Sequence, residues 1–228
     1  MNIIDDKDLT KNYIGSGING RCYKIDNNRV YKRFKKANKD YSFIEDLHDF
    51  ACENKSNIFL FPKELVYSGK DIIGYITDYA GNRNLDFMDQ DIKIDYLINE
   101  IKRLEREIVR YSCLHLKLFD MHIGNIFISE KTPIKVIDTD EYYFDSSSPG
   151  TLLEQNLSQA SYPLINGIFD GQLSFKNRKL NYDKNTCFLG GLLVSDYINR
   201  VINELESVKE DKIDTVGDLQ ENIRLILK

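Results

Sequence analysis

The sequence lacks the features that would assign it directly to several classes of protein. Its four cysteines, Cys22, Cys52, Cys113 and Cys187, stand far apart and form no Cys-x-x-Cys pair. This spacing excludes a disulfide framework or a zinc site and favours reduced thiols. No basic stripe is present either, because lysines alternate with acidic residues along a chain of net charge −5. Nucleic-acid binding is therefore not expected.

Long apolar runs are also missing, so we expect no membrane helix and no membrane partner. The first residues, MNIIDDKDLTK, are acidic where a secretory signal would be basic and then apolar, which predicts a cytoplasmic protein. With 228 residues, 42% hydrophobic and 29% charged, the chain can form one large globular domain or two small lobes. Its bias toward Asn, Ile, Lys and Asp is typical of an AT-rich bacterial genome.

The first third of the chain reads mainly as strands. Residues 12–34 predict three strands, with a glycine-rich turn after Tyr13 and a hairpin at Asp26-Asn27-Asn28. Apolar residues at helical spacing predict one helix over 39–54. The runs ELVYSG (64–69) and IIGYITDYAG (72–81) then predict a further hairpin.

The remainder reads mainly as helices. The strongest helix is expected over 91–115, followed by two short strands, NIFI (125–128) and IKVID (134–138). SSSPG (146–150) interrupts regular structure, and further helices are expected around 189–208 and 215–227. The order predicts an α+β protein with a β-rich lobe over 1–78 and an α-rich lobe over 79–228.

A glycine-rich loop and a lysine form the first candidate site. Gly15, Gly17 and Gly20 in GSGING lie between two predicted strands, where backbone N–H groups can approach phosphate oxygens. A plain hairpin bend explains these glycines about as well. Lys32 follows on the returning strand, and a buried ammonium there would need a carboxylate partner. The next helix offers Glu45 first and Glu53 second.

The stretch KLFDMHIGNIFI (117–128) carries the second candidate site. Asp120, His122 and Asn125 stand among apolar residues, where polar groups are costly to bury unless something binds them. Asp138 closes the strand IKVID, eighteen residues after Asp120. Phosphoryl transfer needs a carboxylate that orients the substrate hydroxyl. It also needs oxygen ligands for Mg²⁺, which an amide and a second carboxylate can supply.

These motifs, in this order, resemble the signature set of the protein-kinase-like superfamily over residues 12–155. The resemblance implies a bilobal fold with an antiparallel β N-lobe carrying one helix and a mostly α C-lobe. It implies ATP and Mg²⁺ as cofactors, Asp120 as catalytic base, Lys32 paired with Glu45 at the phosphates, and Asn125 and Asp138 as metal ligands. The residues implied to contact the nucleotide are Gly15, Ser16, Gly17, Gly20, Val30, Lys32, Thr77, Asp78, Ala80 and Phe127.

The chain departs from eukaryotic-type kinases in several places. Leu118-Phe119 stands where those enzymes have His-Arg, so no arginine receives an activation-loop phosphate. The usual Asp-Phe-Gly reads Asp138-Thr139-Asp140, and SSSPGTLLE is a loose substitute for Ala-Pro-Glu. DMHIGN is similar to the D-x-H-x-G-N of aminoglycoside phosphotransferases, which points to a small atypical bacterial kinase. We expect His122 to brace its loop.

The sequence leads us to expect an ATP- and Mg-dependent serine/threonine kinase that phosphorylates a protein, itself included at Ser16 or at Ser146 to Ser148. One alternative is a kinase for a small-molecule alcohol, whose cationic substrate the acidic residues Glu141, Asp145, Glu154 and Asp170 would attract. A second alternative is a nucleotide-binding pseudokinase or scaffold, and a third is an enzyme that transfers AMP from the same site.

Overall fold

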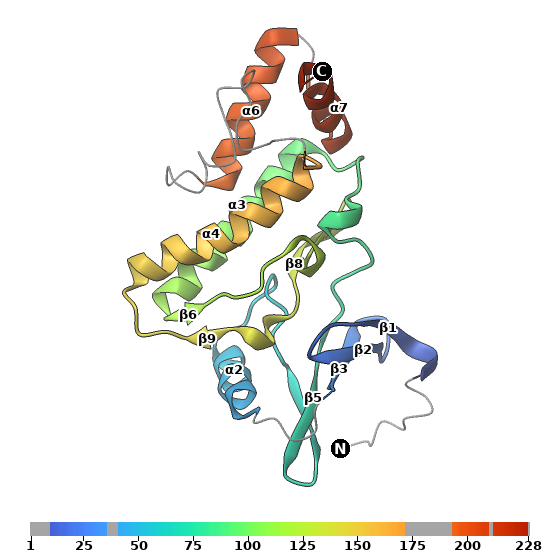
Figure 1. The fold of residues 1–228 in the computed structure, drawn as a ribbon, viewed down its shortest axis with the longest axis vertical. Coiled ribbons are helices and arrows are strands. Elements are labelled where there is room, and N and C mark those ends of the chain that lie inside the picture. Colours follow the sequence, from blue (N-terminus) through green and yellow to red (C-terminus); the bar gives the residue numbers. More distant parts are fainter. Residues whose placement is uncertain (1–9, 36–40, 172–192, 210–211, 228) are drawn as a thin grey trace. The chain divides into compact units, whose positions relative to one another are not determined.

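The computed structural model describes residues 10–35, 41–171, 193–209 and 212–227 (Figure 1). The protein is α+β, with a five-stranded antiparallel sheet and one helix followed by a mostly helical region. It divides into two compact units: the first ends at Ala80 and also takes in Asp138–Asp140, and the second holds Gly81–Ile137 and the chain from Glu141 onward. The break falls at Gly81, whose φ of 121° suits only glycine.

The first unit is built on a sheet of strand order β1-β2-β3-β5-β4. Its elements are η1 (Thr10–Asn12), β1 (Tyr13–Ser16), β2 (Gly20–Lys24), β3 (Arg29–Phe34), α2 (Ser42–Glu53), β4 (Glu64–Ser68) and β5 (Asp71–Asp78). The predicted strands and both hairpins are confirmed. The predicted helix is present as α2, and residues 39–40 of that prediction lie outside the described part of the chain.

Helix α2 packs its apolar stripe against one face of this sheet. Ile44 and Leu47 are buried on the helix, and Phe34, Leu65 and Tyr75 are buried on the strands. The ring of Phe34 also stacks on that of Tyr41, with centroids 4.0 Å apart. A second cluster, formed by Tyr23 and Tyr31 with Ile25, Val66 and Ile76 packed against them, completes the core of this unit.

In the second unit, the long helices α3 (Ile94–Cys113) and α4 (Pro149–Ile168) pack side by side (Figure 1). Every apolar position expected on α3, from Ile94 to Tyr111, is buried. Helices α6 (Val194–Lys209) and α7 (Val216–Leu227) follow. The short elements are η2 (Leu85–Phe87), β6 (Leu116–Lys117), η3 (Ile123–Asn125), β7 (Ile126–Ser129), β8 (Thr132–Val136), η4 (Thr139–Glu141) and β9 (Tyr143–Phe144).

Two small pairings frame the polar stretch of the second unit. Strands β7 and β8 form the predicted hairpin, and β6 pairs antiparallel with β9, a pairing that the sequence did not predict. Helix α4 begins at Pro149, so only the first part of the stretch SSSPG, which we expected to interrupt regular structure, precedes the helix. None of the helices within the described residues is long and apolar enough to cross a membrane.

The packing around Gly74 on the central strand β5 yields a stability prediction. A Cβ at Gly74 would lie 2.2 Å from the Lys32 carbonyl oxygen and 2.8 Å from the Tyr31 ring. Gly74→Ala should therefore lower the free energy of unfolding by about 2–3 kcal/mol, because overpacking forces backbone shifts. A Cβ at Gly15 meets nothing within 4 Å, so Gly15→Ala should change stability by less than about 0.5 kcal/mol in the same urea titrations. Equal effects of the two substitutions would contradict the packing.

Candidate active site

Lys32 lies at the centre of a buried polar cluster in the first unit. Its Nζ donates to Asp138 Oδ1 at 2.8 Å and to Asp140 Oδ1 and Oδ2 at 2.7 and 3.0 Å. Lys32 is 5% exposed and Asp140 3%. Lys32 and Asp138 are 106 residues apart in sequence. The structure therefore brings together two of the residues that the sequence singled out.

Strand register explains why Lys32 faces this cluster. Cys22, Lys32 and Tyr75 are directly opposite one another on β2, β3 and β5, so their side chains share one face of the sheet. Phe34, two residues after Lys32, shares that face and joins the core beneath α2. The lysine is thus buried because its strand face is covered.

Tyr75 completes the cluster. Its hydroxyl donates to Asp140 Oδ1 at 3.0 Å, and the Lys32 ammonium lies 5.9 Å from its ring centroid. Burial, reinforced by the Asp140 charge, raises the pKa of Tyr75 well above its ordinary value, so the phenol stays a hydrogen-bond donor. Burial alone would lower the pKa of Lys32, but the Asp140 and Asp138 carboxylates outweigh it and raise that pKa. The lysine is therefore cationic at neutral pH.

The catalytic-loop candidates lie in the second unit. Asp120 is exposed, whereas Asn125 is buried, and Asn125 Nδ2 donates to the Asp120 carbonyl oxygen at 3.0 Å. His122 Nδ1 accepts from the Gly124 N–H at 3.1 Å and caps η3, the bracing contact that the sequence favoured. A Cβ at Gly124 would lie 2.9 Å from the His122 ring, so a larger residue here would displace that ring from its capping position.

Asn156 fixes the chain just before Asp120 and was missed by the sequence analysis. From the middle of α4 its Oδ1 accepts from the Leu118 N–H at 2.9 Å. Its Nδ2 donates to the Leu116 carbonyl at 3.0 Å and to Ser112 Oγ at 2.9 Å. A fully buried amide with three hydrogen bonds holds the approach to Asp120 in one conformation.

Asp120, the predicted base, and Asp138, a predicted metal ligand, both have left-handed backbone conformations. Asp120 has φ of 52° and Asp138 has φ of 57°. In the part of the chain that the structure describes, only two other non-glycine residues have positive φ, His115 and Asp170. Such conformations are uncommon outside glycine and cluster at functional sites, where the surrounding structure holds them.

The glycine-rich loop lies over Asp138 in the first unit. A Cβ at Gly17 would be 3.9 Å from Asp138 Oδ2, and one at Gly20 would press on the Lys32 side chain at 3.0 Å. The Gly17 N–H donates to the Gly20 carbonyl, so in this conformation it is not directed at a ligand. Gly15 and Ser16 lie on β1, where Ser16 is exposed.

The predicted pairing of Lys32 with Glu45 is wrong. Glu45 is exposed and accepts from the Tyr67 hydroxyl at 3.1 Å, and the second choice, Glu53, is exposed as well. The cause is the phase of α2, because Ile44 and Leu47 face the sheet and Glu45 is turned away from it by one residue. Asp138 and Asp140 take the place of the glutamate.

The residues around Val30 and Thr77 that the resemblance implies to contact the nucleotide are largely engaged in protein contacts. Val30 is buried and opposes Thr77 in the β3–β5 register. The Thr77 hydroxyl donates to the Leu60 and Phe61 carbonyls, and Asp78 pairs with Lys63 at 2.6 Å. Ala80 is buried, and Phe127 lies on β7 of the second unit, half-buried.

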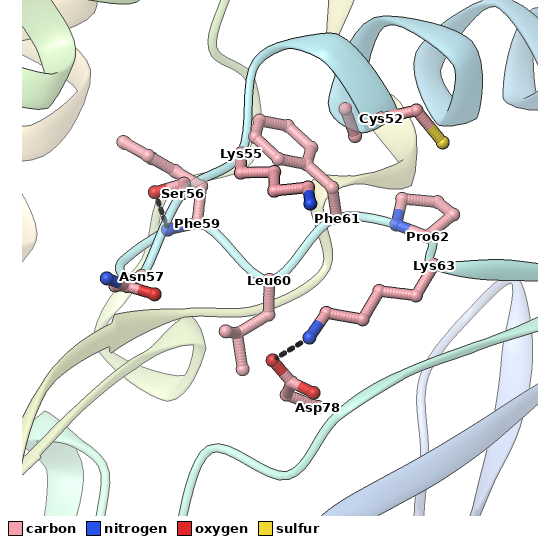
Figure 2. Close-up of a pocket in the computed structure, with 11 residues that line it drawn as sticks. Cys52, Lys55, Ser56, Asn57, Phe59, Leu60, Phe61, Pro62, Lys63 and Asp78 are labelled. Atoms are coloured by element: carbon pink, nitrogen blue, oxygen red, sulfur yellow. Dashed lines mark hydrogen bonds and ion pairs between the residues drawn. The ribbon is translucent and has the colours of Figure 1, made fainter.

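A pocket of about 360 Å³ opens elsewhere in the first unit, beside the end of α2 (Figure 2). Its walls come from Ala51, Cys52 and residues 55–57 and 59–63, and Lys63 reaches Asp78 at its edge. Of the predicted nucleotide residues only Asp78 lines it. This pocket is therefore distinct from the Lys32 cluster.

The predicted metal ligands suit a hard cation by their chemistry. No hydrogen bond to Asp138 Oδ2 is present among the described residues, and the Asp138 side chain is 31% exposed. The amide nitrogen of Asn125 donates to the Asp120 carbonyl, and the amide oxygen is the atom of this side chain that could bind a cation. Within the described residues there is no group of three or more His, Cys, Asp or Glu side chains suited to a metal. Mg²⁺ that is held with substrate phosphates needs only one or two protein oxygens.

Asp140, Tyr75 and Asn156 are the site residues that sequence reasoning missed. Asp140 had a visible signal, since it follows Asp138 by two residues at a strand end. No protein-family model matches the chain, and no curated protein matches it.

The cluster gives a prediction for cysteine reactivity. Burial raises the pKa of Cys22 to about 11; the Lys32 ammonium opposes this rise, and the Asp138 and Asp140 charges add to it. At pH 8 roughly one thiol in a thousand is then the reactive thiolate. Iodoacetamide at pH 8 should leave Cys22 unmodified while it labels the exposed Cys52 and Cys113, as peptide mass spectrometry would show. Labelling of Cys22 as fast as the other two would contradict its raised pKa.

Proposed function

We propose that this chain is an ATP- and Mg-dependent phosphotransferase with the bilobal protein-kinase-like fold, and that it phosphorylates serine or threonine on proteins. The observation that carries the proposal is the ion pair between the buried Lys32 and the partly exposed Asp138, 106 residues apart. The kinase resemblance implies that the lysine after the glycine-rich loop and the metal-binding aspartate belong to one site, and Lys32 and Asp138 are in contact. Burying the charges of Lys32 and Asp140 is costly unless each is paired.

The roles follow from the environment of each group. Lys32 is cationic and suited to a phosphate oxygen, and Asp138 offers Oδ2 to a metal. Asp120 is exposed on a braced loop, where its carboxylate can accept and orient a substrate hydroxyl proton. When bound, Mg²⁺ would neutralise charge on the transferred phosphoryl group, with Asn125 and Asp138 as its protein ligands.

A protein acceptor is favoured over a small cationic alcohol. Of the four acidic residues that would attract such a substrate, Asp170 pairs with Arg224 and Asp145 accepts from the Ser147 N–H. Their charges are thus partly used within the protein. Among the predicted self-phosphorylation sites, Ser16 and Ser146 are exposed, whereas Ser148 caps α4 by accepting from the Thr151 N–H.

The test is transfer of label from the γ-phosphate of ATP with Mg²⁺. Label should enter protein, on serine or threonine of the chain itself or of an added acceptor protein. Label in a small alcohol would support the small-molecule kinase, and label retained in ATP would support a pseudokinase. Label that enters protein from the α-phosphate instead would indicate AMP transfer.

Substitutions should separate the roles. Asp120→Asn and Asp138→Asn should each lower the transfer rate roughly 10³-fold, since a positioned base and a metal ligand are lost. Lys32→Met should lower it roughly 10²-fold. Asp71→Asn, the same chemical change at an exposed hairpin residue, should leave the rate within about twofold. Transfer that survives Asp120→Asn and Asp138→Asn in folded protein would overturn the proposal.

A further inference from the structure

We propose that Asp140, held by the Tyr75 hydroxyl, is the positioning residue for Lys32, in place of a glutamate on α2. The inference rests on the proposed function, because it assigns the residue that keeps Lys32 directed at the phosphates. It is carried by the geometry of the four side chains that the first unit gathers, Lys32, Tyr75, Asp138 and Asp140.

The two carboxylates differ in how completely they are used. Asp140 bonds Lys32 through both oxygens and also accepts from Tyr75 at Oδ1, and its side chain is 4% exposed. Asp138 bonds Lys32 through Oδ1 alone, and its side chain is 31% exposed. Asp140 is therefore committed to the lysine, whereas Asp138 retains an oxygen for a metal.

Two carboxylates keep Lys32 paired where a single carboxylate could not. If Asp138 turns to a bound cation, its bond to the lysine weakens, and a buried ammonium without a partner would be strongly destabilised. Asp140 keeps Lys32 paired throughout and limits where the ammonium can lie. The third group on that segment, Thr139, is fully buried and donates to the Leu60 carbonyl at 3.2 Å, which fixes the backbone between the two carboxylates.

The same geometry makes α2 dispensable for pairing the lysine. Glu45 is exposed and its carboxylate accepts a hydrogen bond from the Tyr67 hydroxyl. The cluster around Lys32 is therefore complete without any residue of α2. Tyr75, on the strand beside Lys32, supplies the anchoring hydrogen bond from the rigid sheet instead. Activity should accordingly depend on Asp140 and Tyr75 and be insensitive to Glu45.

The kinetic test compares Asp140→Asn, Asp140→Glu and Tyr75→Phe with Glu45→Gln and the surface control Asp71→Asn. Asp140→Asn should lower kcat/KM for ATP roughly 100-fold, and Tyr75→Phe roughly fivefold. Asp140→Glu should recover part of the loss, since it restores a carboxylate. Glu45→Gln should stay within twofold of the unchanged chain. A loss for Glu45→Gln equal to that for Asp140→Asn would overturn the inference.

A double substitution tests whether Asp140 acts through the lysine. In a Lys32→Met background, Asp140→Asn should cause no further loss of kcat/KM, because the residue that it positions is gone. Independent, multiplying losses would show that Asp140 has a separate role and would contradict the proposal.

A stability measurement separates this inference from failure of the proposed function. Lys32→Met leaves the buried Asp140 and the partly exposed Asp138 without their cation, so its urea midpoint should fall, and adding Asp140→Asn should raise the midpoint again. If the midpoint falls and then rises in this way but the chain transfers no detectable phosphate, the proposed function is overturned while the Lys32–Asp140 pair is supported. If the double variant unfolds at a lower midpoint than Lys32→Met alone, the pair itself is contradicted.

Discussion

The buried ammonium of Lys32 is the constraint on which the rest of the first unit depends. An unpaired charge at 5% exposure would be too costly for a sheet of this size, so carboxylates must reach it. They come from Asp138 and Asp140, which the chain supplies only after passing through Gly81–Ile137. The polar cluster of the first unit is thus completed by a segment distant in sequence, whereas the apolar core of that unit comes from residues between Tyr23 and Ile76.

One lysine with two carboxylates leaves the cluster with a formal charge of −1. The Tyr75 hydroxyl offsets part of this excess, and the remaining accepting capacity is at Asp138 Oδ2, below Gly17. A site with an available anionic oxygen under a glycine-rich loop is suited to a cation and to the phosphates that accompany it. The electrostatic imbalance and the glycine therefore favour the same chemistry.

Local patterns in the sequence were enough to predict the elements but only part of the site. Alternation along β3 and the glycine spacing predicted where Lys32 lies, and a strand end predicted Asp138. The Glu45 pairing failed because helical phase depends on which face packs, and Ile44 and Leu47 decided that face. Asp140 was missed because its direction depends on the left-handed turn at Asp138, which residue type alone does not specify.

Tyr75 and Asn156 illustrate a further limit of sequence reasoning. Each looks like an ordinary member of its element, a strand aromatic and a helix amide, yet each satisfies buried polar groups that belong to distant segments. Buried hydrogen-bond donors and acceptors select one partner strongly, because the alternative is an unsatisfied group. In both units an amide or hydroxyl from a rigid element thus fixes the segment that carries a strained aspartate, and the strain at Asp120 and Asp138 can persist for that reason.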